Sequence, residues 1–392
     1  MIPELRADFN RRWTAAAYAE FLRRLDAESG AHVEFRCSET PVFLPADLLA
    51  QMVRYGQELY DQLATNPAYQ KAADATIPAQ FRVPNCTEHP LFVQADFGLI
   101  RQADGTLAPR LVEIQGFASI YAFQATLAQQ YKNAYSLADD LTPFLGDLDE
   151  LGYFALLRKA ILGDHAPEEV ILLEIDPLRQ KTAPDFLLTR KQLGIKIACI
   201  RDVKRQGAKL FFEGVPIKRI YNRVIVDELV RKNVQGGFDF KDYLDVEWAG
   251  HPNWFFLLSK FSLPWFRHEC VPETQFLSDV DGLPDNLADY VLKPLYSFAG
   301  LGVKIDPSKE DIAAIPEQRR NEFILQRKMD FVPTVDTPSG PTKIEVRIMY
   351  IGTNGAMQPV TTVVRSGRGK MMGVDFNKDL DWVGATAGFH KR

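Results

Sequence analysis

Three oxygen-bearing side chains near the start of the sequence could hold a divalent cation. Asp96 lies within the apolar run Leu91–Ile100, and Glu113 ends a second apolar run together with Gln115. A buried carboxylate without a partner costs several kcal/mol, so a cation or an arginine is expected beside each acid. Glu113 and Gln115 have the period of two that points both side chains to one face of a strand, and magnesium prefers oxygen ligands. The alternative is a pair of edge-strand carboxylates that face water.

A lysine and a glycine turn far along the chain could hold phosphates. Lys293 follows three apolar residues and precedes a proline, so its ammonium is expected at a strand end, where a point charge can meet a phosphate. The turn from Ser297 contains Gly300 and Gly302, whose missing Cβ atoms let backbone N–H groups approach phosphate oxygens. The alternative is an ordinary hairpin with a solvated lysine.

Arginines in two neighbouring strands could bind an anionic group. Arg347 lies in the apolar run 345–351, and Arg365 ends the run 359–365. A guanidinium stays charged at any working pH and binds a carboxylate or a phosphate through two parallel hydrogen bonds. These two residues are therefore candidates for clamping an acyl phosphate or a substrate carboxylate. Structural salt bridges to neighbouring acids are the alternative.

The elements that position these residues follow from hydrophobic periodicity. Apolar spacing predicts helices over 12–30 and 45–63, and the Asp-Gly turn between two apolar runs predicts a hairpin over 91–114. Strand, helix and strand patterns over 170–174, 184–193 and 195–200, continued at 219–223, predict a small Rossmann-like unit. It lacks GxGxxG, so a dinucleotide is not expected. Short strands are predicted at 290–294 and 323–326, and an antiparallel pair over 345–351 and 359–365.

Composition sets the class of protein. The 392 residues suggest two or three domains, and 46% hydrophobic with 25% charged residues is typical of a globular protein. A net charge of −5 gives no general attraction to nucleic acid or to a membrane surface. No run of 18 apolar residues occurs, so no membrane span is expected. The four cysteines are far apart, which argues against zinc and a disulfide framework and favours the cytoplasm.

The hairpin and the lysine turn carry a resemblance to a known family. A hydrophobic strand with Asp96, a glycine turn and a strand with Glu113 and Gln115 resembles the magnesium hairpin of ATP-grasp enzymes, and Lys293 with the glycine turn resembles their phosphate-binding segment. The hairpin usually comes last but comes first here. This order resembles the circularly permuted branch that contains glutathionylspermidine synthetase and the permuted glutathione synthetases.

The resemblance implies roles for individual residues. Asp96, Glu113 and Gln115 match magnesium ligands, Lys293 matches the phosphate-binding lysine, and Ser297 to Gly302 matches a lid loop. The segment 323–328, with Gln326 and Lys328, resembles the hinge strand that contacts adenine, and Lys260 takes the place of an earlier nucleotide-binding lysine or is a lysine on a helix surface. Ser119 matches a serine that helps to hold the carboxylate substrate. Asn222 and Arg223, which end the Rossmann-like unit, are further substrate candidates.

The sequence departs from the family at two positions. Gln115 stands where the family usually has asparagine, which moves the amide oxygen by one methylene group. The hinge lacks the usual glutamate that holds the ribose, and Asp330 is a possible substitute.

The resemblance predicts an α/β protein with a permuted ATP-grasp fold in three parts. Residues 1–150 would supply helices and the magnesium hairpin, 151–250 a Rossmann-like domain that precedes the ATP-grasp part, and 251–392 the nucleotide-binding subdomains with the lid. The expected function is an ATP- and Mg²⁺-dependent carboxylate–amine ligase that acts through an acyl phosphate. Its partners would be a small carboxylate, such as an amino acid or a short peptide, and an amine, and a homodimer is possible. A small-molecule kinase and a non-catalytic ATP-binding protein are the alternatives.

Overall fold

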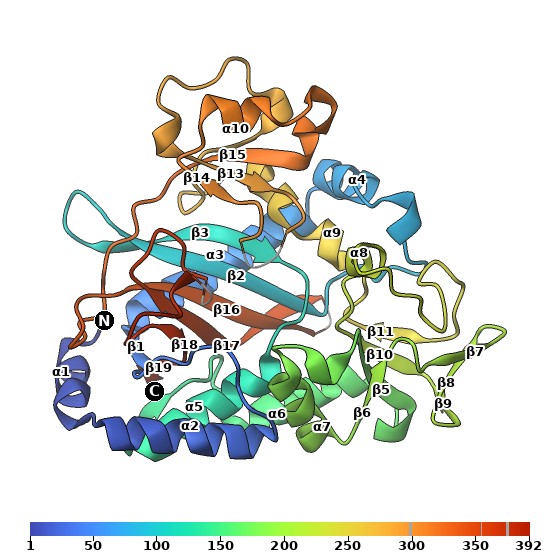
Figure 1. Ribbon diagram of the computed structural model, residues 1–392, viewed down its shortest axis with the longest axis horizontal. Helices are drawn as coiled ribbons and strands as arrows, with labels where there is room; N and C mark the ends of the chain where they lie inside the picture. Colours follow the sequence, from blue (N-terminus) through green and yellow to red (C-terminus); the bar gives the residue numbers. More distant parts are fainter. Residues whose placement is uncertain (298–299, 354, 374–375) are drawn as a thin grey trace.

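A five-stranded antiparallel sheet joins strands from both halves of the chain (Figure 1). Its order is β18 (Gly384–Thr386), β17 (Ala356–Gly367), β16 (Lys343–Thr353), β2 (Phe92–Arg101) and β3 (Leu107–Gln115). The computed structural model describes residues 1–297, 300–353, 355–373 and 376–392. The predicted hairpin is confirmed as β2 and β3, and the predicted pair as β16 and β17, although Asn354 of its turn lies outside the described residues.

Residues of this sheet alternate between an apolar face and a polar face. Val93, Ala95 and Phe97 of β2 belong to the main hydrophobic core, which includes apolar residues of α3 (Ala46–Ala64). The residues between them in β2 face the opposite side, because successive side chains of a strand alternate. Cross-strand partners share a face, so the register Asp96↔Glu113 and Arg347↔Asp96 brings three charged side chains together on that side.

A smaller antiparallel sheet stands beside the first one. Its order is β12 (Thr274–Phe276), β15 (Phe323–Arg327), β13 (Tyr290–Pro294) and β14 (Lys304–Ile305). It lies above the five-stranded sheet in Figure 1, with α10 (Lys309–Ala313) on its outer side. A 3₁₀ helix, η4 (Lys260–Trp265), contacts both β3 and β15 and so connects the two sheets.

A parallel sheet forms the predicted Rossmann-like unit. Its order is β11 (Glu247–Ala249), β10 (Arg219–Asn222), β5 (Val170–Glu174) and β6 (Lys196–Cys199), and all three pairings are parallel. The helix α7 (Ala183–Leu193) connects β5 to β6, as the strand–helix–strand pattern predicts. Gly194, with φ of 76°, ends this helix in the left-handed region that favours glycine.

The remaining elements surround these three sheets. The predicted helix over 12–30 is confirmed over Ala15–Ser29, and Thr14 caps its start by accepting a hydrogen bond from Ala17 N–H at 3.1 Å. A separate helix before it, Pro3–Arg12, was not predicted. The predicted helix over 45–63 is confirmed as α3. The other helices are α1 (Pro3–Arg12), α2 (Ala15–Ser29), α4 (Pro67–Ala75), α5 (Tyr121–Tyr135), α6 (Glu150–Leu162), α8 (Val226–Arg231) and α9 (Trp254–Leu257). Two three-stranded sheets comprise β1 (Val42–Phe43), β19 (Gly388–Lys391) and β4 (Leu141–Thr142), and β7 (Lys204–Gln206), β8 (Lys209–Phe212) and β9 (Val215–Ile217).

Candidate active site

A cavity of about 690 Å³ is lined by residues from all three of the larger sheets. A volume of this size suits a nucleotide or another small ligand. Most of the candidate site residues from the sequence line it: Glu113, Gln115, Ser119, Arg223, Lys260, Lys293, Gly300, Gln326, Lys328, Arg347 and Arg365. Among the residues that the structure describes, Asp96, Asn222, Ser297 and Gly302 are not part of this lining.

Asp96 is completely buried beneath the polar face of the five-stranded sheet. Arg347 donates to its two carboxylate oxygens through Nε at 2.6 Å and Nη2 at 2.7 Å. Arg365 donates to Oδ2 at 2.5 Å from the neighbouring strand. The alternative of a water-facing Asp96 is therefore excluded. Both oxygens are engaged by guanidinium groups and neither opens into the cavity, so Asp96 is placed to hold arginines in this structure.

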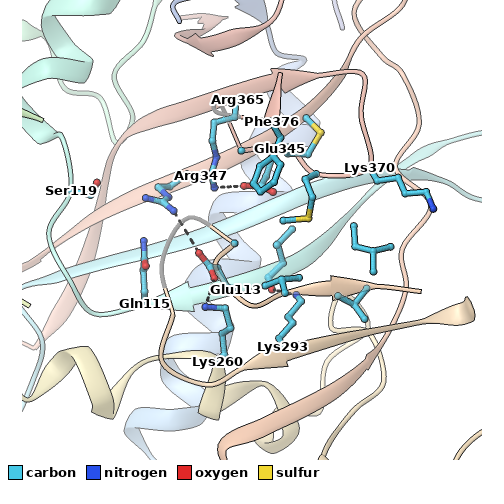
Figure 2. A pocket seen from close by; sticks show the side chains of 18 of the residues that line it. Glu113, Gln115, Ser119, Lys260, Lys293, Glu345, Arg347, Arg365, Lys370 and Phe376 are labelled. Atoms are coloured by element: carbon cyan, nitrogen blue, oxygen red, sulfur yellow. Dashed lines mark hydrogen bonds and ion pairs between the residues drawn. The ribbon is translucent and has the colours of Figure 1, made fainter. Parts of the chain in front are cut away.

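Glu113 faces the cavity between two cations, as Figure 2 shows. Its carboxylate lies 3.2 Å from Lys260 Nζ and 3.8 Å from Arg347 Nη2. Burial by itself would raise the pKa of Glu113, but the charges of Lys260, Arg347, Arg365 and Lys293 outweigh burial and lower the pKa to about 2. Lys260 is buried in η4, so the interpretation as a helix-surface lysine is wrong. Glu113 therefore remains ionised at any working pH.

Glu345 and Arg365 form a further ion pair of this face. They are cross-strand partners in β16 and β17, and the Arg365 guanidinium donates to the Glu345 carboxylate. Burial raises the pKa of Glu345, and the nearby charge of Arg365 opposes the effect. The alternative interpretation of Arg347 and Arg365 as salt-bridge partners is thus confirmed, and both still line the cavity.

Lys293 is a buried cation of the cavity wall. It is the last residue but one of β13 and is 6% exposed, so a solvated lysine is excluded. Its Nζ donates to Gln326 Oε1 at 2.6 Å and to the Val112 carbonyl oxygen at 3.2 Å. Burial lowers the pKa of Lys293 to about 8, against the opposing charge of Glu113. Gln326, predicted as a hinge residue, therefore positions Lys293 here.

The predicted metal ligands do not form a metal site in this arrangement. The Gln115 amide lies beside Gln94 at 2.8 Å, and its oxygen, turned toward Arg347, accepts from that guanidinium at 3.1 Å. Among the described residues, no group of three or more His, Cys, Asp or Glu side chains could hold a metal ion. The acids of this face are paired instead with arginine or lysine, so the donor set does not fit a resident magnesium ion.

The glycine turn after β13 is described on both sides of Phe298 and Ala299, which lie outside the described residues. Gly300 and Gly302 have φ of 75° and 74°, in the left-handed region that favours glycine. The Ser297 carbonyl oxygen accepts from Lys260 Nζ at 2.8 Å. This bond connects the start of the turn to the lysine that faces Glu113.

The predicted hinge contributes polar groups to another wall of the cavity. Lys328 donates to Asp306 at 2.5 Å, and Lys370 lies 2.7 Å from the same carboxylate. Side-chain hydrogen bonds to these two lysines lower the pKa of Asp306. Asp330, the possible substitute for a ribose-binding glutamate, also lines the cavity.

The far end of the cavity lies at the carboxyl ends of the parallel strands, where open α/β sheets bind ligands. Arg223 follows β10 and is 6% exposed, and its Nε and Nη1 atoms have no hydrogen-bond partner among the described residues. It lies over the rings of Phe117 and Phe186 at 5.5 and 5.6 Å. Asn222 is buried and bonds to the Val224 backbone, so it shapes the strand end.

Three residues of the site were missed by sequence reasoning, and each carries a signal that could have found it. Gln94 and Glu345 stand two residues before Asp96 and Arg347 in the same strands, so the period of two places them on the polar face. Glu174 is a charged residue that directly follows an apolar run, 170–173, as Lys293 follows the apolar run 290–292. Glu345 and Glu174 both line the cavity.

Comparison with solved structures finds a similar fold in a glutathione synthetase-like effector from Globodera pallida, determined in its apo form, with a TM-score of 0.56. The match covers 95% of this chain and 97% of that chain at 12% sequence identity. No family model matches the sequence, and no curated protein matches it. The protein therefore has a glutathione synthetase-like α/β fold. Among the described residues, no helix is long and apolar enough to cross a membrane.

Proposed function

We propose that this protein is an ATP-dependent carboxylate–amine ligase with a permuted ATP-grasp fold. The observation that carries the proposal is the convergence of four cations, Lys260, Lys293, Arg347 and Arg365, on one end of the cavity. Lys260, Arg347 and Arg365 are held by ion pairs with acids, and Lys293 is held by hydrogen bonds to Gln326 and to the Val112 carbonyl oxygen. These contacts fix the four cations before a ligand arrives. Preorganised cations of this kind stabilise the charge of a transferring phosphoryl group.

The proposed reaction has two steps. A substrate carboxylate oxygen attacks the γ-phosphorus of ATP, the bond between that phosphorus and the ADP oxygen breaks, and an acyl phosphate forms. The amine nitrogen then attacks the acyl carbon, the bond from carbon to phosphate oxygen breaks, and inorganic phosphate leaves. Lys293 and Lys260 would neutralise the triphosphate, and Arg347 and Arg365 would face the acyl phosphate. Arg223 would bind an anionic group of a substrate at the far end.

Magnesium enters the proposal only as the ion that accompanies ATP. Glu113 and Gln115 are the predicted ligands that line the cavity, and they would face a metal-bound triphosphate. No step is derived from the ion, because the acids of this face are paired with basic side chains.

A second candidate function is nucleotide binding without catalysis. It is favoured by the pairing of Asp96 with two arginines, which engages both carboxylate oxygens of that predicted metal ligand. The similar solved structure is also described as an effector. Such a protein would bind ATP and release no ADP with any carboxylate. A kinase, the other alternative from the sequence, would release ADP and leave a stable phosphorylated product.

The test uses hydroxylamine, which traps an acyl phosphate as a hydroxamate. Each of the common amino acids and a set of dipeptides is offered as the carboxylate, with ATP and Mg²⁺, and hydroxamate and ADP are measured. We expect hydroxamate with at least one carboxylate and a loss of at least about 100-fold in Lys293→Met. The matched control is Lys309→Met, an exposed lysine of α10, which should retain full activity. An ATP-induced rise in Tm without hydroxamate or ADP would favour the non-catalytic function instead.

A further inference from the structure

A buried acid faces the far end of the cavity without a cationic partner. Glu174 ends β5 and is 7% exposed, and it lines the cavity. Its Oε1 accepts from the Ile175 backbone N–H at 2.7 Å. Within the described ranges, no lysine, arginine or histidine forms an ion pair with it at 4 Å or less. Buried carboxylates are ordinarily paired, so this one is suited to a cationic ligand.

The charges around Glu174 leave it able to change its protonation state. Arg223 acts on it from the end of β10, Glu228 from α8, and Lys232 from the residue after α8. Asp185 of α7 lies near Arg223 and offsets part of its charge. Burial raises the pKa of Glu174 to about 7, and the charge of Arg223 only partly opposes it. A carboxylate with this pKa can accept a proton near neutral pH and release it again.

The position of Glu174 assigns it to the acceptor side of the cavity. The nucleotide end has basic side chains paired with Asp96, Glu113 and Glu345. An ammonium group would be repelled there and attracted by Glu174. Primary amines are protonated at neutral pH and cannot attack a carbonyl until they lose a proton. A ligase therefore needs a group that binds the ammonium and takes its proton.

We propose that Glu174 binds the ammonium group of the amine substrate and acts as the general base that deprotonates it. The inference rests on the proposed ligase function and adds the class of acceptor, a primary amine that arrives protonated. One proton passes from the ammonium to the Glu174 carboxylate and then to solvent. The neutral amine attacks the acyl phosphate, the carbon–oxygen bond to phosphate breaks, and the second amine proton leaves with hydrogen phosphate.

The experiment compares two nucleophiles with one carboxylate. Hydroxylamine is largely unprotonated at neutral pH and needs no base, whereas methylamine, glycinamide and the amino acids arrive as ammonium ions. The carboxylate is the one that gives hydroxamate fastest in wild-type protein. In Glu174→Gln we expect amide formation to fall by at least about 100-fold and hydroxamate formation to stay within about twofold. The glutamine retains the oxygen that accepts from Ile175 N–H.

The controls separate a chemical role from a structural one. Glu168→Gln alters an exposed acid outside the cavity lining and should leave both rates unchanged. Glu174→Asp should recover part of the amide rate. The rate with hydroxylamine also reports directly whether the Glu174→Gln variant is folded and activates the carboxylate.

Other results would contradict either the role of Glu174 or the proposed ligase function. Equal losses of hydroxamate and amide in Glu174→Gln would make Glu174 a carboxylate-binding or structural residue and overturn the inference. An unchanged amide rate, or wild-type hydroxamate without amide from any of the amines, would overturn it as well. No hydroxamate from the wild type would refute the proposed ligase function, and the inference would fall with it.

Discussion

Glu113, which is partly exposed, and Glu174, which is buried, are carboxylates on the wall of one cavity, and the charges around them differ. Glu113 lies among Lys260, Lys293 and two arginines, and its pKa is lowered to about 2. Glu174 has no ion pair among the described residues, and burial raises its pKa to about 7. Burial opposes ionisation at both positions, so the surrounding cations decide the direction of each shift.

The two ends of the cavity differ in how their charges are paired. At one end acids and bases pair with each other, and at the other end a ligand would have to supply the opposite charge. At the end proposed to bind the nucleotide, acids and bases are paired in the protein itself, and this pairing would hold the cations in place for a triphosphate. At the far end, and within the part of the chain that the structure describes, Glu174 has no ion-pair partner and Arg223 has two nitrogens without hydrogen bonds. Mutations at the first end should therefore cost stability, and mutations at the second end should cost little or increase it.

The largest loss of stability is expected when Asp96, the most buried of the ion-paired acids, is removed. Asp96→Ala leaves Arg347 and Arg365 without their shared carboxylate, and removal of one partner from a buried ion pair costs about 3–5 kcal/mol. Urea denaturation measures the free energy of unfolding. Asp285→Ala, at an exposed position, serves as the control and should change it by less than about 0.5 kcal/mol. A loss below about 1 kcal/mol for Asp96→Ala would contradict the paired arrangement.

The next effect tests the lowered pKa of Glu113. Its ionised form is stabilised in the folded state, so its contribution is present above the unfolded pKa of 4.5 and is lost as pH falls toward about 2. Glu113→Gln should reduce the free energy of unfolding by about 3 kcal/mol at pH 7 and by much less at pH 2.5. Denaturation at both pH values checks this, and a pH-independent difference would argue against the surrounding charges as the cause.

At Glu174, mutation is expected to increase the free energy of unfolding rather than to reduce it. The folded state favours protonated Glu174, so wild-type stability falls as pH rises from 4.5 through about 7. Glu174→Gln removes this fall and should be more stable than wild type by about 2 kcal/mol at pH 8, after the cost of burying the amide, with no gain at pH 4. Thermal and urea unfolding at the two pH values measure the difference. Lower stability of the variant at pH 8 would show that Glu174 has an unrecognised partner.

The smallest effect concerns Arg223. Its guanidinium has two unsatisfied nitrogens and contacts two aromatic rings, so desolvation and cation–π attraction oppose each other. Arg223→Met should change the free energy of unfolding by less than about 1 kcal/mol. It should raise the KM for the anionic substrate far more than it lowers kcat. A large loss of stability would show that Arg223 makes stabilising contacts, as the ion-paired residues at the other end of the cavity do.

Much of the fold could be predicted from local patterns. The Asp-Gly turn identified the β2–β3 hairpin, and apolar runs separated by a helical segment identified the parallel unit. The helix α1 was missed because its sequence is mostly charged and polar, whereas the apolar spacing over 12–30 identified α2. The pairing of Asp96 with Arg347 was not predictable from spacing, since it depends on which strands become neighbours in a sheet assembled from distant segments.

That assembly has a consequence for synthesis on the ribosome. Asp96 lies 251 residues before Arg347 and 269 before Arg365 in the chain. At about 5–20 residues per second, its arginines emerge roughly 10–50 s after it does. Until then the hairpin cannot bury Asp96 without an uncompensated charge. The polar face of the nascent β2–β3 segment is therefore expected to stay hydrated until the strands that carry Arg347 and Arg365 have left the ribosome.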